Sequence, residues 1–426
     1  MHRVKPDKPN IYHGKDTRYK LAAMSSKAAV QATKPAAYVP ELDGIRGIAI
    51  ACVMALHFYS DPFRHPHNFV ESVVARIAGY GMWGVDLFFV LSGYLITGIL
   101  WDTRGSKHYF RTFYVRRTLR IFPLYYAVLF VILVVIPAGF LGHYAPGALK
   151  IRPLQGWLWS YLANVYVARE GSFSIPYVSH FWTLAIEEHF YLFWPFVIGL
   201  FERKTAILTT VILGLAAFGS RIVLHACGVN DMVEHVITPC RLDSLCMGAF
   251  FALAVRGKGG ADALGERMKL WLPLSAAALG ILMLAHAPHS SWDAIAIPLK
   301  GLLLAGFCGT FIVVAAWSRG PEFMKWPLRI GWLRTLGKYS YGLYVFHAII
   351  SYYFWERNIL RYFTSWFSSR TLAVLVEGAV GMALSCLIAF ASYELFELHF
   401  LRLKRFFEPA RGPVHAAVEP DRVHVR

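Results

Sequence analysis

The residues best suited to chemistry lie in an apolar stretch, residues 42–60. Arg46 and His57 are eleven positions apart, in a stretch otherwise dominated by Ile, Ala, Val, Met and Leu. Eleven residues complete about three helical turns, so both side chains face the same side, roughly 16 Å apart along the axis. Asp43 precedes Arg46 by three positions and shares that face. This polar stripe predicts either a reaction site or, as the alternative, a packing histidine with a snorkelling arginine.

A carboxylate is expected beside the histidine. Asp86 is the acid of the next apolar segment, GMWGVDLFFVLSGYLITGIL (81–100), and lies near the start of that segment. If the two helices pack antiparallel, Asp86 neighbours His57, where a carboxylate fixes the imidazole tautomer and raises its basicity. Ser92 and Tyr94 follow and can donate hydrogen bonds, although small residues here are also typical of plain helix packing.

Two further acids lie in the segment 181–200. Glu187 and Glu188 are adjacent in an aromatic-rich helix, so they point in different directions and one of them is expected to face the interior. We expect Glu187 to reach about the depth of His57 and to meet His57, Arg241 or an acceptor hydroxyl, because an unpartnered carboxylate there would be costly. A purely structural role for both acids is the alternative.

Three arginines stand at one end of the third apolar segment. Arg116, Arg117 and Arg120 precede Pro123 in FYVRRTLRIFPLYY. Basic residues are typical of the cytoplasmic end of a membrane helix, but a cluster of guanidinium groups also suits phosphate groups.

Later segments add further polar residues, and none of them suggests a metal. Arg241 stands at the start of the segment 239–255, and Lys338 begins another segment that carries Tyr344 and His347. We expect Arg241, Tyr344 and His347 to support the site.

No metal centre is expected. The six cysteines form no closely spaced ligand pair, and five of them lie in or at the edge of apolar segments. His180 and His189 lack the i, i+4 spacing of a helical metal site. We therefore expect neither a zinc site, nor a permanently bound cofactor, nor a disulfide framework.

The elements that must position these residues are membrane helices. Of 426 residues, 56% are hydrophobic and 16% are charged, whereas soluble domains carry about 25% charged residues. The apolar runs predict an all-α polytopic membrane protein with about ten transmembrane helices. The expected spans are about 44–60, 81–100, 119–141, 181–200, 205–224, 239–255, 270–286, 297–317, 338–355 and 372–395. The short apolar segment 154–168 is expected to be interfacial or re-entrant.

We attribute the net charge of +17 to basic residues that set the orientation of the protein in the membrane, and we do not expect a nucleic-acid partner. Basic residues lie in short loops between apolar runs, which is typical of charges that set membrane topology. With the N-terminus inside, the inner segments hold 31 Lys and Arg residues and the outer segments hold 8. Both termini are therefore expected in the cytoplasm. The predicted organisation is a basic cytoplasmic segment 1–40, a membrane domain 41–400 and a basic cytoplasmic tail 401–426.

Taken together, these stretches resemble the acyltransferase 3 family, integral-membrane O-acyltransferases that modify bacterial surface polysaccharides and other acceptors. The resemblance runs from about residue 38 to 400. It rests on five motifs in order: Arg46 with His57 after ten residues, Gly84 to Gly93, Arg116 to Pro123, Glu187 to Tyr191, and Tyr339 to His347. At residue 189 a histidine stands where the family more often has glutamine.

The resemblance implies transfer of an acyl group, often acetyl, from a cytoplasmic donor such as acetyl-CoA to a hydroxyl, with a carbohydrate-type acceptor often met outside the bacterial inner membrane. The arginine cluster and Lys338 would bind the CoA donor, and His57 would act on the acceptor hydroxyl or carry the acyl group itself. The expected catalytic residues are His57, Glu187, Asp86 and Arg46. The expected supporting residues are Asp43, Ser92, Tyr94, Arg241, Tyr344 and His347.

Two other functions fit the same residues. A transporter or flippase without covalent chemistry also needs charges near the middle of the membrane, but repeated halves and paired broken helices are not visible in the sequence. A membrane hydrolase would use the same histidine and glutamate without a CoA donor. Transfer from acetyl-CoA by the purified protein in detergent distinguishes these functions.

Overall fold

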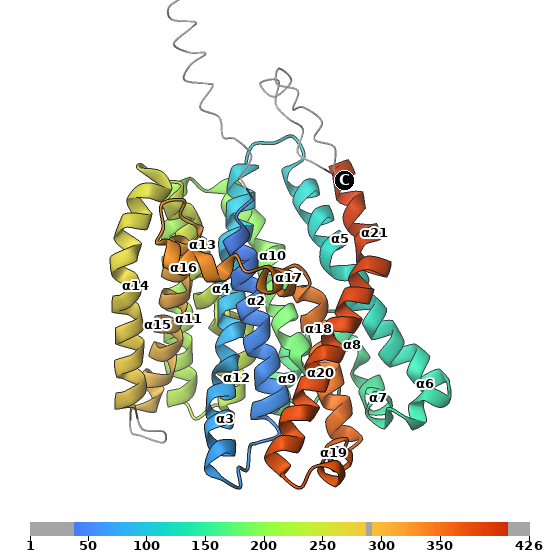
Figure 1. The fold of residues 1–426 in the computed structure, drawn as a ribbon. Coiled ribbons are helices and arrows are strands. Elements are labelled where there is room, and N and C mark those ends of the chain that lie inside the picture. Colours follow the sequence, from blue (N-terminus) through green and yellow to red (C-terminus); the bar gives the residue numbers. More distant parts are fainter. Residues whose placement is uncertain (1–37, 287–291, 408–426) are drawn as a thin grey trace, which may run out of the picture. The chain divides into compact units, whose positions relative to one another are not determined.

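The computed structural model describes residues 38–286 and 292–407, and this part of the chain is helical, without strands (Figure 1). Val39–Pro409 forms one compact unit. The basic segments predicted at 1–40 and 401–426 fall mostly outside the described residues. The helices of the described part are α2 (Pro40–Ala55), α3 (Phe69–Gly79), α4 (Trp83–Asp102), α5 (Tyr109–Phe130), α6 (Ile136–Ala138), α7 (Pro146–Ile151), α8 (Gln155–Trp159), α9 (Ala163–Glu170), α10 (Trp182–Leu200), α11 (Arg203–Ala226), α12 (Asp231–Val236), α13 (Thr238–Val255), α14 (Gly260–Ala285), α15 (Asp293–Ala316), α16 (Glu322–Leu328), α17 (Gly331–Lys338), α18 (Ser340–Glu356), α19 (Leu360–Trp366), α20 (Arg370–Ser392) and α21 (Leu398–Leu403).

Within the described residues, eight helical stretches are long and apolar enough to cross a membrane. They are Pro40–Ser60, Phe69–Asp102, Tyr109–Ala138, Arg203–Ala226, Asp231–Val255, Gly260–Ala285, Asp293–Ala316 and Arg370–Phe407. Each overlaps one of the predicted spans, as a multi-pass membrane protein requires. The other two predicted spans, 181–200 and 338–355, are also helices, α10 and α18. They are not among the eight stretches because α18 has only 17 residues and α10 carries two glutamates and a histidine, which make it less apolar. The total of ten spans and the side on which the termini lie stay predictions.

The segment 154–168 is not one long helix. It forms the short helices α8 and α9, which are separated at Tyr161, a residue with a positive φ of 58°. A residue with that backbone conformation interrupts an α-helix. The prediction that this segment is not a full span therefore agrees with its local structure.

Local sequence signals explain several helix starts. Pro40 occupies the first turn of α2, where the missing N–H of proline costs nothing. The side chain of Asn68 accepts a hydrogen bond from the backbone N–H of Glu71 at 2.9 Å and caps α3. Ser369 caps α20 in the same way through the N–H of Leu372.

The central helices cross very closely. α4 packs against α2, α10 and α13, and Figure 1 shows α2 and α4 side by side. At the crossing of α4 with α13, a Cβ on Gly93 would collide with the carbonyl of Leu245, and a Cβ on Gly248 would collide with that of Val90. Glycine at both positions therefore lets the two backbones touch, as is common between membrane helices.

A buried ion pair fastens α4 to α13 near this crossing. Asp86 accepts hydrogen bonds from the Arg241 guanidinium and from Ser244 Oγ, and both charged residues are buried. Next to it, Arg221 of α11 donates to Asp243 of α13. These contacts fix the relative rotation of three helices.

Asp86→Ala should destabilise the fold by about 3–5 kcal/mol, because it leaves the Arg241 charge buried without its partner. The thermal unfolding midpoint in detergent measures this loss. Lys269→Ala is the matched control, because it removes a partly exposed ion pair with Glu266 and should cost about 0–1 kcal/mol. Equal midpoints for the two variants would contradict the structural role of Asp86.

Candidate functional site

His57 lies in a π-helical turn, Leu56–Ser60, that ends the first helix. Its Nδ1 is 2.9 Å from Oδ2 of Asp61, and Oδ1 of Asp61 accepts hydrogen bonds from Nε and Nη2 of Arg64 at 3.3 and 3.0 Å. Turns of this kind are frequent at functional sites. An ionised Asp61 accepts the Nδ1 proton of His57 and leaves the Nε2 lone pair free for a base or a nucleophile.

Asp61 is held in the ionised form. Burial raises its pKa, but the hydrogen bonds and charges of His57 and Arg64 outweigh burial and lower the pKa below its ordinary value. The carboxylate is therefore charged at neutral pH and can orient the His57 ring.

The carboxylate that contacts His57 is therefore Asp61, and not Asp86 as the sequence predicted. Asp86 is turned toward α13, where its partners are Arg241 and Ser244. Asp61 was missed because the helix was expected to end at residue 60. The available signal was its spacing of four residues from His57, which places the two on one helix face.

Two more histidines, His347 and His180, lie next to His57. The ring of His347 is 5.2 Å from that of His57 and 5.4 Å from that of His180. Nδ1 of His347 contacts the carbonyl of Leu343, and Nε2 of His180 contacts the carbonyl of Val345. Among the described residues, Nε2 of His347 and Nδ1 of His180 have no hydrogen-bond partner although both rings are buried. Buried ring nitrogens of this kind are normally satisfied by water or ligand.

These histidines adjoin a large cavity of about 1000 Å³, which His57, Asp61 and His180 line directly. Its size suits a substrate of several rings. Aromatic side chains supply much of its wall, and they include Phe173, Tyr177, Trp182, Tyr352 and Trp355. Such rings offer flat apolar surface next to polar edges.

A smaller cavity of about 190 Å³ contains the arginines. Arg46, Arg117 and Arg120 line it, and most of its remaining wall is apolar. Arg46 donates to Oδ1 of Asp43 at 2.5 Å, and the guanidinium of Arg117 lies 4.1 Å from the ring centroid of Tyr191. We call this the arginine cavity.

Glu187 also lines the arginine cavity. Its carboxylate interacts with Arg117 and with the hydroxyls of Ser92 and Tyr191. The predicted contact with His57 or Arg241 is not present. Glu187 therefore belongs with the arginines, and Ser92, whose hydroxyl shares a hydrogen bond with that of Tyr191, lines the same cavity.

The two cavities are neighbours that share part of their wall. Tyr344 and Val85 line both of them. The hydroxyl of Tyr344 is 2.5 Å from Oγ1 of Thr183 and donates to the carbonyl of His180 at 3.0 Å. Tyr344 was expected only to support the site, yet its place between the arginines and the histidines makes it central.

Two predicted donor-binding residues lie outside the arginine cavity. Arg116 donates to the carbonyl of Lys404 at 3.2 Å. Lys338 donates to the hydroxyl of Tyr339 at 3.0 Å and lies 3.6 Å from Glu394. Sequence spacing could not separate Arg116 from its neighbours, because the three arginines share one short segment.

Two predicted supporting residues also lie apart from the cavities. Tyr94 is partly buried against apolar side chains of the core. The guanidinium of Arg241 forms an ion pair with Asp86. Neither side chain lines either cavity.

Comparisons with known proteins point to one family. A family model described as an acyltransferase domain matches residues 39–394. The O-acetyltransferase OatA of Staphylococcus aureus is 28% identical over 382 residues, covering 84% of this chain and 57% of the relative. The peptidoglycan O-acetyltransferase OatA of Listeria monocytogenes is 28% identical over 325 residues, covering 73% of this chain and 49% of the relative.

A putative peptidoglycan O-acetyltransferase of Bacillus subtilis, YrhL, is 30% identical over 322 residues, covering 73% of this chain and 48% of the relative. The chain thus spans about half the length of the curated relatives it matches. No solved structure matches.

Proposed function

This chain belongs to the acyltransferase 3 family, and on that premise we propose that it moves an acyl group, most simply acetyl, from acyl-CoA to a hydroxyl of a carbohydrate acceptor. One observation carries the proposal. A cavity lined by three arginines and a cavity lined by a histidine–aspartate pair share Tyr344 in their walls. The cavity with the arginines can hold an anionic donor, and the cavity with His57 and Asp61 can activate a hydroxyl. Acyl transfer needs both functions.

The arginine cavity is the proposed donor site. CoA carries phosphate groups, and guanidinium groups bind phosphate through paired, charge-assisted hydrogen bonds. Arg117 and Arg120 would face those phosphates, and the apolar wall would take the pantetheine arm. The excess of Lys and Arg in the predicted inner segments supports a cytoplasmic donor.

The large cavity is the proposed acceptor site. Its aromatic lining offers apolar platforms for sugar rings, and His57 with Asp61 stands at its wall. Two relatives carry peptidoglycan O-acetyltransferase in their names, which supports a cell-wall polysaccharide as acceptor. The protein would then work in the plasma membrane of a bacterium, with this cavity on the outer side.

The proposed reaction is a direct transfer. Nε2 of His57 takes the proton of the acceptor hydroxyl while Asp61 holds the Nδ1 proton. The acceptor oxygen attacks the thioester carbonyl, a new C–O bond forms, the C–S bond breaks, and CoA leaves as the thiolate. The His57 proton then returns to the thiolate sulfur or to water, so protons balance. Tyr344, between the cavities, would lie beside the thioester.

Proteoliposomes test this function. Labelled acetyl-CoA is supplied on one side and a soluble peptidoglycan fragment on the other, and the label on the fragment is measured by mass spectrometry. Transfer only when donor and acceptor lie on opposite sides supports the proposal. Release of free acetate without labelled fragment identifies a hydrolase, and movement of intact substrate without acylation identifies a transporter.

Arg120→Gln should raise the apparent KM for acyl-CoA about tenfold, because a hydrogen bond to a charged group contributes about 1.5–3 kcal/mol. Arg116→Gln is the matched control, since its side chain lies outside the arginine cavity, and its KM should stay within about twofold. Steady-state kinetics at varied donor concentration measure both, and added salt should reduce the difference. A change confined to the KM for the acceptor would contradict the assignment of this cavity to the donor.

A further inference from the structure

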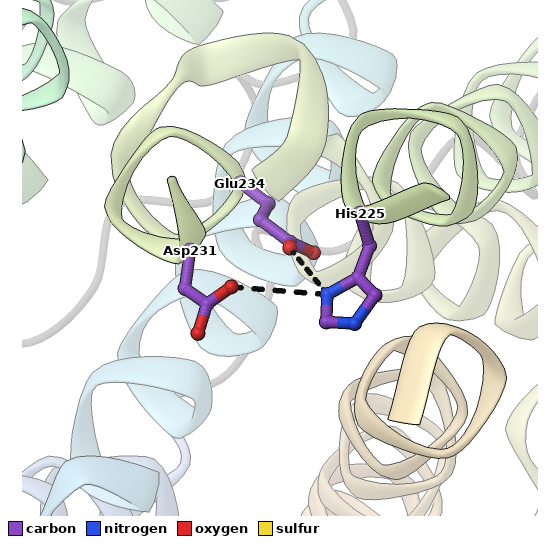
Figure 2. A group of neighbouring side chains, drawn as sticks. All are labelled: His225, Asp231 and Glu234. Atoms are coloured by element: carbon purple, nitrogen blue, oxygen red, sulfur yellow. Dashed lines mark hydrogen bonds and ion pairs between the residues drawn. The ribbon is translucent and has the colours of Figure 1, made fainter. Parts of the chain in front are cut away.

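A second cluster of chemically capable side chains lies away from both cavities. His225 at the end of α11 and Asp231 and Glu234 of α12 turn their side chains toward one another (Figure 2). Nδ1 of His225 is 3.1 Å from Oε1 of Glu234 and 3.8 Å from Oδ1 of Asp231. Among the described residues, this is the place where three potential metal ligands come within 4.8 Å of one another.

We propose that His225, Asp231 and Glu234 bind a divalent transition metal of the zinc class. Zinc binds imidazole nitrogen and carboxylate oxygen at about 2.0–2.2 Å, so ligand atoms around a tetrahedral ion lie roughly 3.3 Å apart. The two distances from Nδ1 bracket that value. An imidazole ligand favours zinc, nickel or copper over calcium and magnesium, which take oxygen ligands.

The burial of Glu234 is an independent reason to expect a cation. Its side chain is 5% exposed, and its hydrogen bond goes to His225. Arg221 also attracts this carboxylate, but its guanidinium donates to Asp243. A buried carboxylate requires a compensating charge. A protonated His225 would balance only one of the two carboxylates that face it, whereas a divalent metal ion would balance both.

The opposite side of the cluster is open. The Asp231 side chain is 82% exposed, so an ion can enter there and water can complete its coordination. Three protein ligands and a water position form a complete tetrahedral site. The ligands come from two helices, so the metal would fasten the end of α11 to α12.

A metal at this position would also affect the wall of the large cavity. His235, next to Glu234 on α12, packs 5.2 Å from the ring of Trp182 and 6.2 Å from that of Phe173. Both aromatic residues line the large cavity. Fixing α12 would therefore fix one wall of that cavity, and the metal would stabilise the protein whatever the substrate is.

The test measures metal content and stability, independently of acyl transfer. The full chain is purified in detergent through a tag without histidine, loaded with Zn²⁺, dialysed and analysed by mass spectrometry for metal. We expect about one zinc per chain. Chelator treatment should lower the thermal unfolding midpoint, and Zn²⁺ but not Mg²⁺ should restore it. Co²⁺ in place of Zn²⁺ should give the visible absorption of a tetrahedral nitrogen and oxygen site.

Single substitutions locate the ion. Glu234→Gln and Asp231→Asn keep side-chain size, and each should weaken zinc affinity at least about tenfold. His399→Gln, in an exposed histidine of α21, is the matched control and should keep wild-type affinity. Asp231 is on the surface, so its variant stays informative if Glu234→Gln fails to fold. The proposal is overturned if the wild type retains no zinc after dialysis, or if Asp231→Asn binds zinc as tightly as the wild type.

Discussion

Replacing His57 with alanine should lower the rate of acyl transfer by about 10²–10⁴-fold, the usual contribution of a positioned general base. The imidazole stands at the wall of the large cavity, and Asp61 holds its Nδ1 at 2.9 Å. The substitution removes the group that would accept the hydroxyl proton, while the helix that carries it should still form. Initial rates with saturating acetyl-CoA and a soluble carbohydrate acceptor measure the loss.

Asp61→Asn provides a second, graded version of the same test. The amide keeps the size of the side chain but removes the charge that orients His57, so kcat should fall by about 10²-fold with little change in the KM for acyl-CoA. Asp86→Asn distinguishes a structural role of Asp86 from the catalytic role that the sequence predicted. If the role is structural, the substitution should lower the unfolding midpoint more than kcat. A His57→Ala protein that inserts normally and keeps near wild-type transfer refutes the proposed role.

Glu187→Gln should lower kcat/KM for acyl-CoA by about 10²-fold. A hydrogen bond to a charged group contributes about 1.5–3 kcal/mol, and tenfold corresponds to about 1.4 kcal/mol. Glu187 interacts with Arg117, Ser92 and Tyr191 in the arginine cavity. Its loss should therefore release Arg117 from the position in which it faces the donor.

A half-reaction with acyl-CoA alone locates this effect. Because Glu187 lies with the arginines and does not contact His57, slow donor hydrolysis should fall with Glu187→Gln even when no acceptor is present. Glu188→Gln is the comparison variant. Its carboxylate also feels the charge of Arg117, but its Oε1 has no hydrogen-bond partner among the described residues, so its loss should cost less than that of Glu187, which also interacts with Ser92 and Tyr191. Normal donor hydrolysis with a defect only in acceptor use would place Glu187 in the acceptor step instead.

The sequence by itself determined the class of the protein and the helices that carry its chemistry. Apolar runs identify membrane helices because a segment that buries its backbone in hydrocarbon must be helical and apolar over its length. Helical periodicity also placed Arg46 and His57 on one face, and in the structure each lines one of two cavities that share Tyr344 in their walls. The family followed from motifs along the chain, and the match to residues 39–394 confirmed it.

Only the tertiary structure decided which of these polar residues meet. Periodicity fixes the face of a side chain on its own helix, but it does not fix how that helix is rotated against its neighbours. Close packing at Gly93 and Gly248 accompanies the turn of Asp86 toward Arg241, which leaves His57 with the local partner Asp61, four residues further along the chain. Packing likewise places Glu187 near Arg117 and leaves Arg116 outside the arginine cavity. A buried charge is stable only beside its partner, and which partner is near is settled by contacts between helices distant in sequence.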